Sequence, residues 1–363
     1  MIQLFHKLYA AADAMYRAHS FDRTPTGAIL AFEVLIVAAA GLVLWRLWRS
    51  EGKGVQEFAV AAGGLFIHQF FTSSMWHNYK MGWWAYIYQD ISWISTLAWA
   101  MMIMAAIKLV DRFFRTLEDW QRFPLYLALL APAALVYEAV LLKLGVSGYA
   151  PEVQQALGGH TLLGAPVEAF VYVPVFMALV VSFTKYWVFY LNDKPIIPLP
   201  RRPWLRSLAV TAVAVLLFEL TVEPMVENVG FPAWSYIYRD ISVVLTGAWI
   251  VLVWLAINAV DKSLIHYDLL KKFAAYLLVV FVVVMPMELW LMARGCRVYS
   301  PSTAAAFTGL HIPWTQLPIE VAFGTPLYFA LVLSFVKYWE IVLDDPHLLP
   351  GGGGPLSRTG QGA

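Results

Sequence analysis

Tyr86-Ile-Tyr-Gln-Asp90-Ile-Ser92 returns 150 residues later as Tyr236-Ile-Tyr-Arg-Asp240-Ile-Ser242, and this internal repeat decides the fold. A second stretch, Ser182-Phe-Thr-Lys185-Tyr-Trp187, returns near the end as Ser334-Phe-Val-Lys337-Tyr-Trp339. Apolar segments resemble one another by composition alone, but acids, prolines and aromatic residues at matched spacing do not. The matches therefore indicate two copies of one structural unit.

Composition indicates a membrane protein. Of the 363 residues, 60% are hydrophobic and only 13% are charged, and the mean hydropathy is +0.64. Soluble domains carry about 25% charged residues. Long apolar runs recur at the length that a membrane-spanning helix needs, about 20 residues. They predict nine spans, near residues 28–47, 57–76, 86–108, 124–143, 166–190, 206–226, 237–260, 272–292 and 316–341.

The repeat sets the predicted organisation of the chain. Four spans per unit is an even number, so both copies share one orientation, as parallel repeats do. The predicted fold is an all-α integral membrane protein with two parallel four-helix repeats and one extra N-terminal span. The predicted segments are an N-terminal interfacial segment with the first span (1–56), repeat 1 (57–200), repeat 2 (201–346) and a disordered tail (347–363).

Charge and cysteine content narrow the function classes. Most of the 25 Lys and Arg lie in alternate loops, which predicts an outer N-terminus and a cytoplasmic C-terminus, as in a bacterial inner-membrane protein. The net charge is +1, and no nucleic-acid motif is present. The single cysteine, Cys296, excludes an intrachain disulfide and a cysteine-cluster metal site.

Two Pro-x-Glu motifs, Pro166/Glu168 and Pro318/Glu320, open the last span of each repeat. Proline favours the first turn of a helix, and an acid there complements the helix dipole, so one interpretation is a helix-start signal. The other interpretation is chemical, because a buried carboxyl that keeps its proton is a general acid. Both interpretations stay open at this point.

Four further acids recur within or beside apolar sequence. Glu138 and Glu288 need partners inside the helix bundle, and a structural hydrogen bond is as good an explanation as catalysis. Asp90 and Asp240 lie at the start of predicted spans, which favours helix capping over a role near the substrate. The orientation predicts that all six repeated acids lie toward the outer surface, and that the pseudo-twofold axis brings the two sets toward a common interface.

The second repeat carries an additional acidic cluster. Glu219, Glu223 and Glu227 are four residues apart, which predicts one shared helix face. His77 occupies the position in repeat 1 that matches Glu227. An aqueous polar cluster fits these residues better than a metal site, because no paired-histidine pattern accompanies them.

Aromatic and basic residues are the remaining candidates for a role at the site. Aromatic faces stabilise cations, and several aromatic residues fall near the acids in sequence. The predicted substrate-facing and cation-stabilising residues are Asp90, Asp240, Trp84, Trp234, Tyr149, Tyr299, Trp290 and Trp314. Lys185 and Lys337 are predicted to snorkel to the membrane surface instead of acting in chemistry.

The second copy resembles a known family. It reads Met287-Glu288-Leu-Trp290, then Arg294-Gly295, then Leu317-Pro318-Ile-Glu320-Val-Ala-Phe323. This order is similar to that of the membrane-bound lycopene cyclase domain and related integral-membrane terpene cyclases. The family's paired Glu-Glu is a single Glu here, and the repeat has four spans, not three.

The resemblance implies a membrane-embedded cyclase or isomerase that protonates an isoprenoid, either carotenoid-like or terpenoid-like, without a redox cofactor. It casts Glu168 and Glu320 as the acid/base pair, and Glu138 and Glu288 as supporting acids. The expected partners are a lipophilic small-molecule substrate and membrane lipids. Two alternatives remain: a spiroketal-forming or other non-terpenoid cyclase, and a transporter or lipid carrier with proton-binding acids at the repeat interface.

Overall fold

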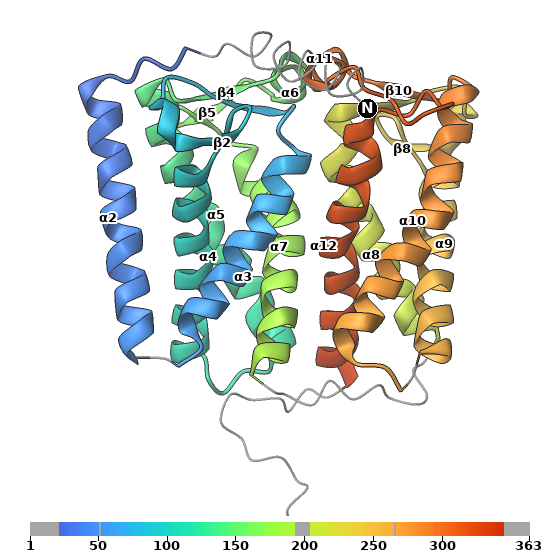
Figure 1. Cartoon of the computed structure of the whole chain (residues 1–363), viewed down its shortest axis with the longest axis horizontal. Coiled ribbons are helices and arrows are strands. Elements are labelled where there is room, and N and C mark those ends of the chain that lie inside the picture. The colour runs from blue at the N-terminus through green and yellow to red at the C-terminus, as the bar shows by residue number, and fades with distance from the viewer. Residues whose placement is uncertain (1–21, 51, 193–203, 265, 345–363) are drawn as a thin grey trace, which may run out of the picture.

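The computed structural model describes residues 22–50, 52–192, 204–264 and 266–344 (Figure 1). Over these residues the chain forms nine long helices, as predicted. They are α2 (Gly27–Ser50), α3 (Gly54–Phe71), α4 (Trp93–Phe113), α5 (Asp119–Leu144), α7 (Ala169–Leu191), α8 (Trp204–Val222), α9 (Val243–Ser263), α10 (Leu269–Ala293) and α12 (Ile319–Asp344). The predicted tail 347–363 and most of the predicted interfacial segment lie outside the described residues.

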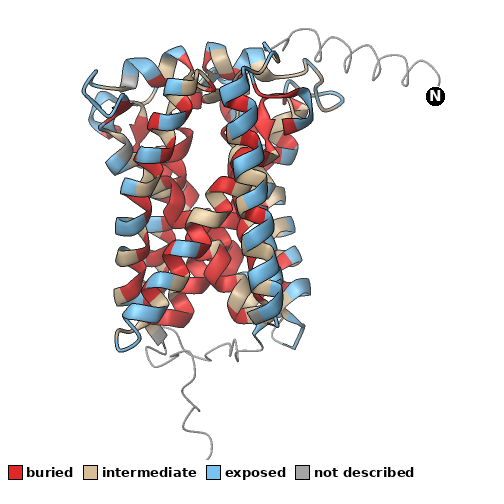
Figure 2. Cartoon of the chain, turned by 90° about the vertical axis from the view of Figure 1, so that its left-hand side faces the viewer, coloured by how far each residue is buried: buried red, intermediate tan, exposed pale blue. Residues whose placement is uncertain are grey.

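Eight of these helices are long and apolar enough to cross a membrane. The ninth, α3, has 18 residues and carries Glu57, His68 and Gln69, which lower its hydropathy. It nevertheless runs among the other helices (Figure 1). Exposed residues lie largely on the outer faces of the helices, and buried residues lie in the interior of the bundle (Figure 2). The protein is therefore an all-α, multi-pass integral membrane protein.

The helices form two bundles with the same order of elements. Bundle 1 contains α3, α4, α5 and α7, and bundle 2 contains α8, α9, α10 and α12. The bundles meet mainly where α7 packs against α12 (Figure 1). Helix α2 packs against α3 and α4, outside the repeat.

One end of the molecule, the strand end, carries short strands and two short helices (Figure 1). The strands are β1 (Trp76–Asn78), β2 (Tyr86–Tyr88), β3 (Ile91–Ser92), β4 (Ser147–Tyr149), β5 (Thr161–Leu162) and β6 (Ala165–Pro166), followed in the second half by β7 (Val226–Asn228), β8 (Tyr236–Tyr238), β9 (Ile241–Ser242) and β10 (Arg297–Tyr299). The short helices are α6 (Pro151–Ala156) and α11 (Pro301–Ala306), and the 3-10 turns are η1 (Trp83–Ala85), η2 (Glu223–Met225) and η3 (Ala233–Ser235).

These strands correct two predicted spans. Residues 86–92 and 236–242 form the hairpins β2–β3 and β8–β9, so α4 begins at Trp93 and α9 at Val243. In the hairpin turns Gln89 and Arg239 adopt positive φ angles of 45° and 46°, which a helix does not allow. Strand β1 pairs with β4, and β7 pairs with β10, so each repeat closes its own bundle at the strand end.

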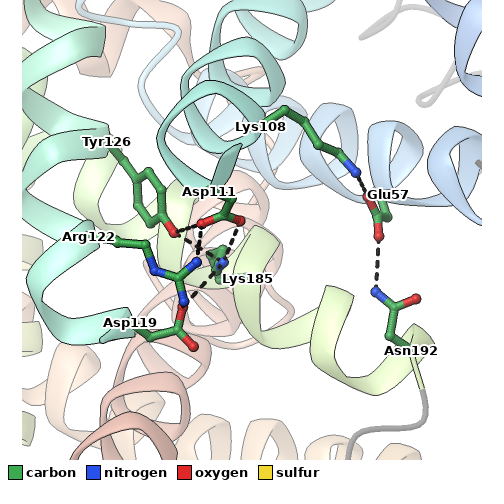
Figure 3. A network of polar contacts seen from close by, with 8 residues as sticks. All are labelled: Glu57, Lys108, Asp111, Asp119, Arg122, Tyr126, Lys185 and Asn192. Atoms are coloured by element: carbon green, nitrogen blue, oxygen red, sulfur yellow. Dashed lines mark hydrogen bonds and ion pairs between the residues drawn. The ribbon is translucent and has the colours of Figure 1, made fainter. Parts of the chain in front are cut away.

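The opposite end is held by buried ion pairs, which overturns the prediction that Lys185 and Lys337 snorkel. Lys185 is buried, and its Nζ lies 3.2 Å from Asp111 Oδ2, in a network with Arg122 and Asp119 (Figure 3). In bundle 2, Lys337 Nζ lies 2.6 Å from the carboxylate of Asp261. Each lysine forms an ion pair with a carboxylate inside its own bundle, and its ammonium group therefore does not extend to the membrane surface.

The tyrosine after each lysine reaches the other bundle. The Tyr338 ring of α12 packs against Phe123 of α5 and Phe189 of α7, with centroids 5.7 Å away in both cases. The Tyr186 ring of α7 lies 6.2 Å from Phe273 of α10. The repeated Lys-Tyr pair therefore anchors each bundle and joins it to its twin.

Candidate functional site

A cavity of about 160 Å³ lies in bundle 1 at the strand end, and we call it cavity 1. Its wall is mainly apolar and aromatic, and it contains a few polar side chains. The residues that matter below are His68, Trp76, Trp99, Glu138, Tyr149 and Tyr172. An apolar cavity with a small set of polar groups is the usual form of a small-molecule site.

Glu138 is surrounded by neutral hydrogen-bond donors. Its Oε1 accepts bonds from Ser147 Oγ and Tyr149 OH, both at 2.9 Å. Both donors come from strand β4, which follows the turn at Gly145, where φ is +67°. Among the described residues, no Lys or Arg forms an ion pair with Glu138. The carboxyl is thus positioned by the repeat's own strand, without a counter-charge.

His68 lies in the wall of the same cavity. Its side chain is only 5% exposed, and Nδ1 has no hydrogen-bond partner among the described residues. The imidazole packs against the rings of Phe176 and Tyr328, with centroids 6.0 and 6.2 Å away. In the neutral imidazole with its hydrogen on Nε2, Nδ1 can accept a proton or a hydrogen bond. The position matching His68 in repeat 2 is Phe218, so only cavity 1 has this group.

The structure corrects the predicted capping role of Asp90 and Asp240. Both residues lie in hairpin turns, and the N-caps of α4 and α9 are Ser92 and Ser242. Asp90 Oδ2 lies 3.1 Å from His77 Nδ1. Burial raises the pKa of Asp90, and the bond with His77 opposes this shift. Asp90 lines cavity 1, whereas Asp240 is absent from the residues that line cavity 2, described next.

A second cavity of about 100 Å³, cavity 2, lies at the strand end, mainly in bundle 2, with part of its wall from repeat 1. Here Glu288, the counterpart of Glu138, is paired: Arg297 Nε donates to both carboxylate oxygens, at 3.0 and 3.2 Å. Tyr299 OH also donates to Glu288, at 3.0 Å. Burial, and then the charge of Glu288, raise the pKa of Tyr299 well above its ordinary value. Arg297 stands at the position of Ser147, so one substitution between the repeats gives Glu288 a counter-charge that Glu138 lacks.

The structure distributes the repeated acids over two neighbouring cavities: Glu138 lines cavity 1, whereas Glu288 and Glu320 line cavity 2, whose wall comes from both repeats. In the described part of the chain, the hydrogen bonds of Glu138 come from repeat 1 and those of Glu288 from repeat 2. All six repeated acids do lie toward the strand end. Ser73 lines both cavities, so the two cavities are neighbours.

Glu168 and Glu320 each hold a loop in place. Glu168 Oε1 accepts the backbone N–H of Gly158 at 2.7 Å, and Glu320 Oε1 accepts that of Thr308 at 2.5 Å. Backbone hydrogen bonds, including that from Gly158, lower the pKa of Glu168. Glu320 lines cavity 2, but Glu168 is absent from the lining of cavity 1. The two motifs are therefore not brought together as one acid/base pair.

The predicted acidic face at Glu219, Glu223 and Glu227 does not form. Helix α8 ends at Val222, because Pro224 interrupts it, and Glu223 lies in η2 while Glu227 lies in β7. Glu219 is buried, Glu223 pairs with Arg239 at 3.0 Å, and Glu227 is exposed. His77 is bonded to Asp90 in the other repeat. Within the described ranges, no group of three or more His, Cys, Asp or Glu is arranged to hold a metal.

The four predicted tryptophans lie away from the cavities. Trp234 is 74% exposed and Trp290 is 56% exposed, Trp314 is fully exposed, and Trp84 packs against Trp93. Tyr149 and Tyr299 do line the cavities. Sequence proximity was misleading here: Trp234 and Trp314 are exposed in the connections at the strand end, and Trp290 is exposed on the outer side of α10. The tryptophans that do line the cavities are Trp76, Trp99 and Trp249, and the matched positions of Trp99 and Trp249 were a signal that the sequence analysis missed.

Comparisons of the chain with protein-family models, curated proteins and solved structures find no match.

Proposed function

We propose that this protein is a membrane-embedded enzyme that cyclises or isomerises a lipophilic substrate in cavity 1 by acid/base chemistry. One observation carries the proposal. Among the residues that the structure describes, the same apolar cavity contains a carboxyl held only by neutral donors, Glu138, and a buried imidazole nitrogen without a hydrogen-bond partner, on His68. Acid/base cyclisation or isomerisation requires a proton donor and a proton acceptor in the same substrate cavity.

In the proposed mechanism these two residues supply and remove one proton each, so no net proton is consumed. The O–H bond of the Glu138 carboxyl breaks, and its proton adds to a carbon–carbon double bond of the substrate, leaving a carbocation. A second double bond of the substrate attacks this cation and closes a ring. His68 Nδ1 then takes a proton from a neighbouring carbon, whose electrons form the new double bond. Proton transfer from His68 back to Glu138, directly or through water, resets the site, and the product has the mass of the substrate.

The cavity wall suits a cationic intermediate. The rings of Trp76, Trp99, Tyr149 and Tyr172 line cavity 1, and aromatic faces attract cations. An isoprenoid, carotenoid-like or terpenoid-like, is therefore the substrate class that we favour. The same acid and base would serve a spiroketal-forming or other non-terpenoid cyclase, in which a hydroxyl oxygen attacks the cation. The proposed steps move protons and need no redox cofactor.

The proposed general acid is Glu138, in place of the Glu168 and Glu320 expected from the sequence. One oxygen of each Pro-x-Glu carboxylate accepts a loop N–H, and Glu168 does not line cavity 1. The transporter alternative depends on proton-binding acids at the repeat interface. Both repeats line cavity 2, but its Glu288 forms an ion pair with Arg297. This ion pair favours the enzyme over the transporter.

We also propose that the strand end faces the outside of a bacterial inner membrane, with the N-terminus outside and the C-terminus in the cytoplasm. The support is the distribution of Lys and Arg, which gather at the opposite end. The substrate would then enter cavity 1 from the membrane, in its outer half.

Product analysis in heavy water tests the enzyme proposal. Membranes carrying the wild type are incubated with acyclic isoprenoids in D₂O, and products are separated and weighed by mass spectrometry. We expect a product with the substrate's composition, altered retention and one added deuterium in place of a hydrogen. Glu138→Gln should lower its yield by at least about 100-fold. His68→Phe, which installs the residue of repeat 2, should lower it as well.

Glu168→Gln is the matched control, because Glu168 holds a loop outside cavity 1 and the amide oxygen keeps that bond. It should retain most of the activity. Loss of activity in Glu168→Gln with full activity in Glu138→Gln would contradict the assignment of the acid. If the wild type converts none of the substrates, proton-coupled uptake by proteoliposomes is the test of the transporter alternative.

A further inference from the structure

We infer that cavity 2 is a binding site for an organic ammonium group, with Glu320 as its counter-charge and an aromatic wall around it. This site lies in the second bundle and goes beyond the proposed chemistry of cavity 1. Its evidence is the charge balance of the cavity, the rings that line it and the space beside Glu320.

The charge balance leaves one carboxylate uncompensated. Cavity 2 is lined by two acids, Glu288 and Glu320, and one base, Arg297. Arg297 Nε lies 3.0 Å from Glu288, so these two charges compensate each other. Glu320 Oε1 accepts the N–H of Thr308, but its Oε2 is buried and has no hydrogen-bond partner in the described part of the chain. A buried carboxylate oxygen of this kind favours a cationic ligand.

The wall of cavity 2 is aromatic and comes from both repeats. Repeat 1 contributes Phe70, Phe71 and Tyr88, and repeat 2 contributes Phe218, Trp249, Phe307 and Phe329. Phe218 lies at the centre of one cluster, with its centroid 6.1 Å from Phe71 and 5.1 Å from Phe329. Rings around a cation are the usual way in which proteins recognise quaternary and other organic ammonium groups. A metal ion, by contrast, needs several oxygen or nitrogen ligands.

A glycine makes room beside the carboxylate. Four residues after Glu320 the chain has Gly324, whereas four residues after Glu168 it has Tyr172. Gly324 lines cavity 2 and Tyr172 lines cavity 1. A Cβ at Gly324 would already lie 3.6 Å from the Phe71 ring, so a tyrosine there would fill the space that we assign to the ligand.

Binding of radiolabelled choline tests the inference. The full-length protein, purified in a maltoside detergent that carries no ammonium group, is dialysed to equilibrium against choline. Its neutral isostere, 3,3-dimethylbutan-1-ol, competes in a parallel series. We expect saturable binding of choline and at least about tenfold weaker binding of the isostere. Absence of saturable choline binding, or equal binding of the isostere, would overturn the inference, and neither result depends on a variant.

Variants locate the site. Glu320→Gln should weaken choline binding by at least about tenfold, because the amide keeps the bond to Thr308 but removes the charge. Gly324→Tyr should block binding by filling the cavity. Glu168→Gln, the twin change outside either cavity, should leave binding within about twofold. Unchanged binding in both Glu320→Gln and Gly324→Tyr would place choline elsewhere and contradict the assignment.

The source of the ammonium group is decided by a further comparison. A short-chain phosphatidylcholine that binds more tightly than free choline would identify the ligand as a lipid headgroup. Tighter binding of free choline or ethylammonium would identify a soluble amine. These experiments measure binding and not catalysis. A negative binding result would therefore contradict the ammonium site without contradicting the proposed enzyme activity in cavity 1.

Discussion

Glu152 and Ser302 occupy matched positions in the two repeats and are bonded to each other. Ser302 donates its backbone N–H to Glu152 Oε1 at 3.1 Å and its hydroxyl to Oε2 at 2.6 Å. The pseudo-twofold axis therefore passes between α6 and α11 at the strand end. Beside this pair, the hydroxyls of Ser74 and Thr303 lie 3.0 Å apart across the same boundary. Polar bonds thus join the two bundles at the end where both cavities lie.

The Glu152–Ser302 bond should give stability a dependence on pH. Partial burial raises the pKa of Glu152, and the hydrogen bonds from Ser302 lower it by more. The net pKa is therefore below the ordinary value of 4.5. A lowered folded pKa contributes stability above about pH 4.5, and this contribution is lost as the pH falls through the folded pKa. Ser302→Ala should therefore cost about 1 kcal/mol at neutral pH and less in acid. Unfolding in mixed micelles at several pH values measures this, and a pH-independent difference would contradict it.

The counter-charge on Glu288 should make the two repeats respond differently to matched substitutions. Arg297→Met leaves Glu288 and the buried Glu219 without their cation, so it should cost about 3–5 kcal/mol of unfolding free energy. Ser147→Ala, at the equivalent position, removes one neutral hydrogen bond to Glu138 and should cost about 1 kcal/mol. Both are measured by unfolding in mixed micelles. Equal costs would refute the described asymmetry.

The buried network at the opposite end should be sensitive to loss of its arginine. Arg122 is fully buried, and its two terminal nitrogens lie 2.8 Å from Asp111 and from Asp119 (Figure 3). Arg122→Met should destabilise the protein by about 3–5 kcal/mol, because two carboxylates lose the buried guanidinium between them and keep only Lys185 as a cationic partner. Lys108→Met is the control: its pair with Glu57 is partly exposed, so the cost should be about 0–1 kcal/mol. A cost for Lys108→Met as large as that for Arg122→Met would show that burial does not set these energies.

The single cysteine tests the proposed orientation. Cys296 lies at the strand end, just before β10, and is partly exposed. If the strand end faces outward, a membrane-impermeant maleimide should label Cys296 in intact spheroplasts. Cys296→Ser is the blank. Labelling that appears only after the membrane is permeabilised would mean that the strand end faces the cytoplasm.

The helices could be predicted from sequence because each is a long apolar run. The strands could not, since three residues are too few to give an alternating pattern, and so Tyr86 to Ser92 was assigned to a span. The repeat placed the acids at one end of the molecule but did not show their partners. Arg297, which compensates Glu288, stands nine residues away and on another element.

The cavity-lining residues were the least predictable part, because side-chain direction depends on packing. Trp290 follows Glu288 by two residues yet is exposed, because the two side chains point to different sides of α10. His68 carried a signal, since the matched residue Phe218 is apolar, but a single histidine in an apolar run is usually structural. Comparing the repeats position by position, as with Ser147 and Arg297, would have found the asymmetry between the two cavities.

The proposed mechanism predicts that Glu138 and Glu288 differ in protonation, and chemical modification can measure this difference. The proposed mechanism requires that Glu138 carries a proton, whereas Glu288 is held as a carboxylate by Arg297. Dicyclohexylcarbodiimide reacts with protonated carboxyls in apolar surroundings, and peptide mass spectrometry locates the adduct. We predict that Glu138 is modified well before Glu288 at neutral pH, and that His68→Phe leaves this order unchanged. Modification of Glu288 first, or of both at the same rate, would contradict the assignment of Glu138 as the acid.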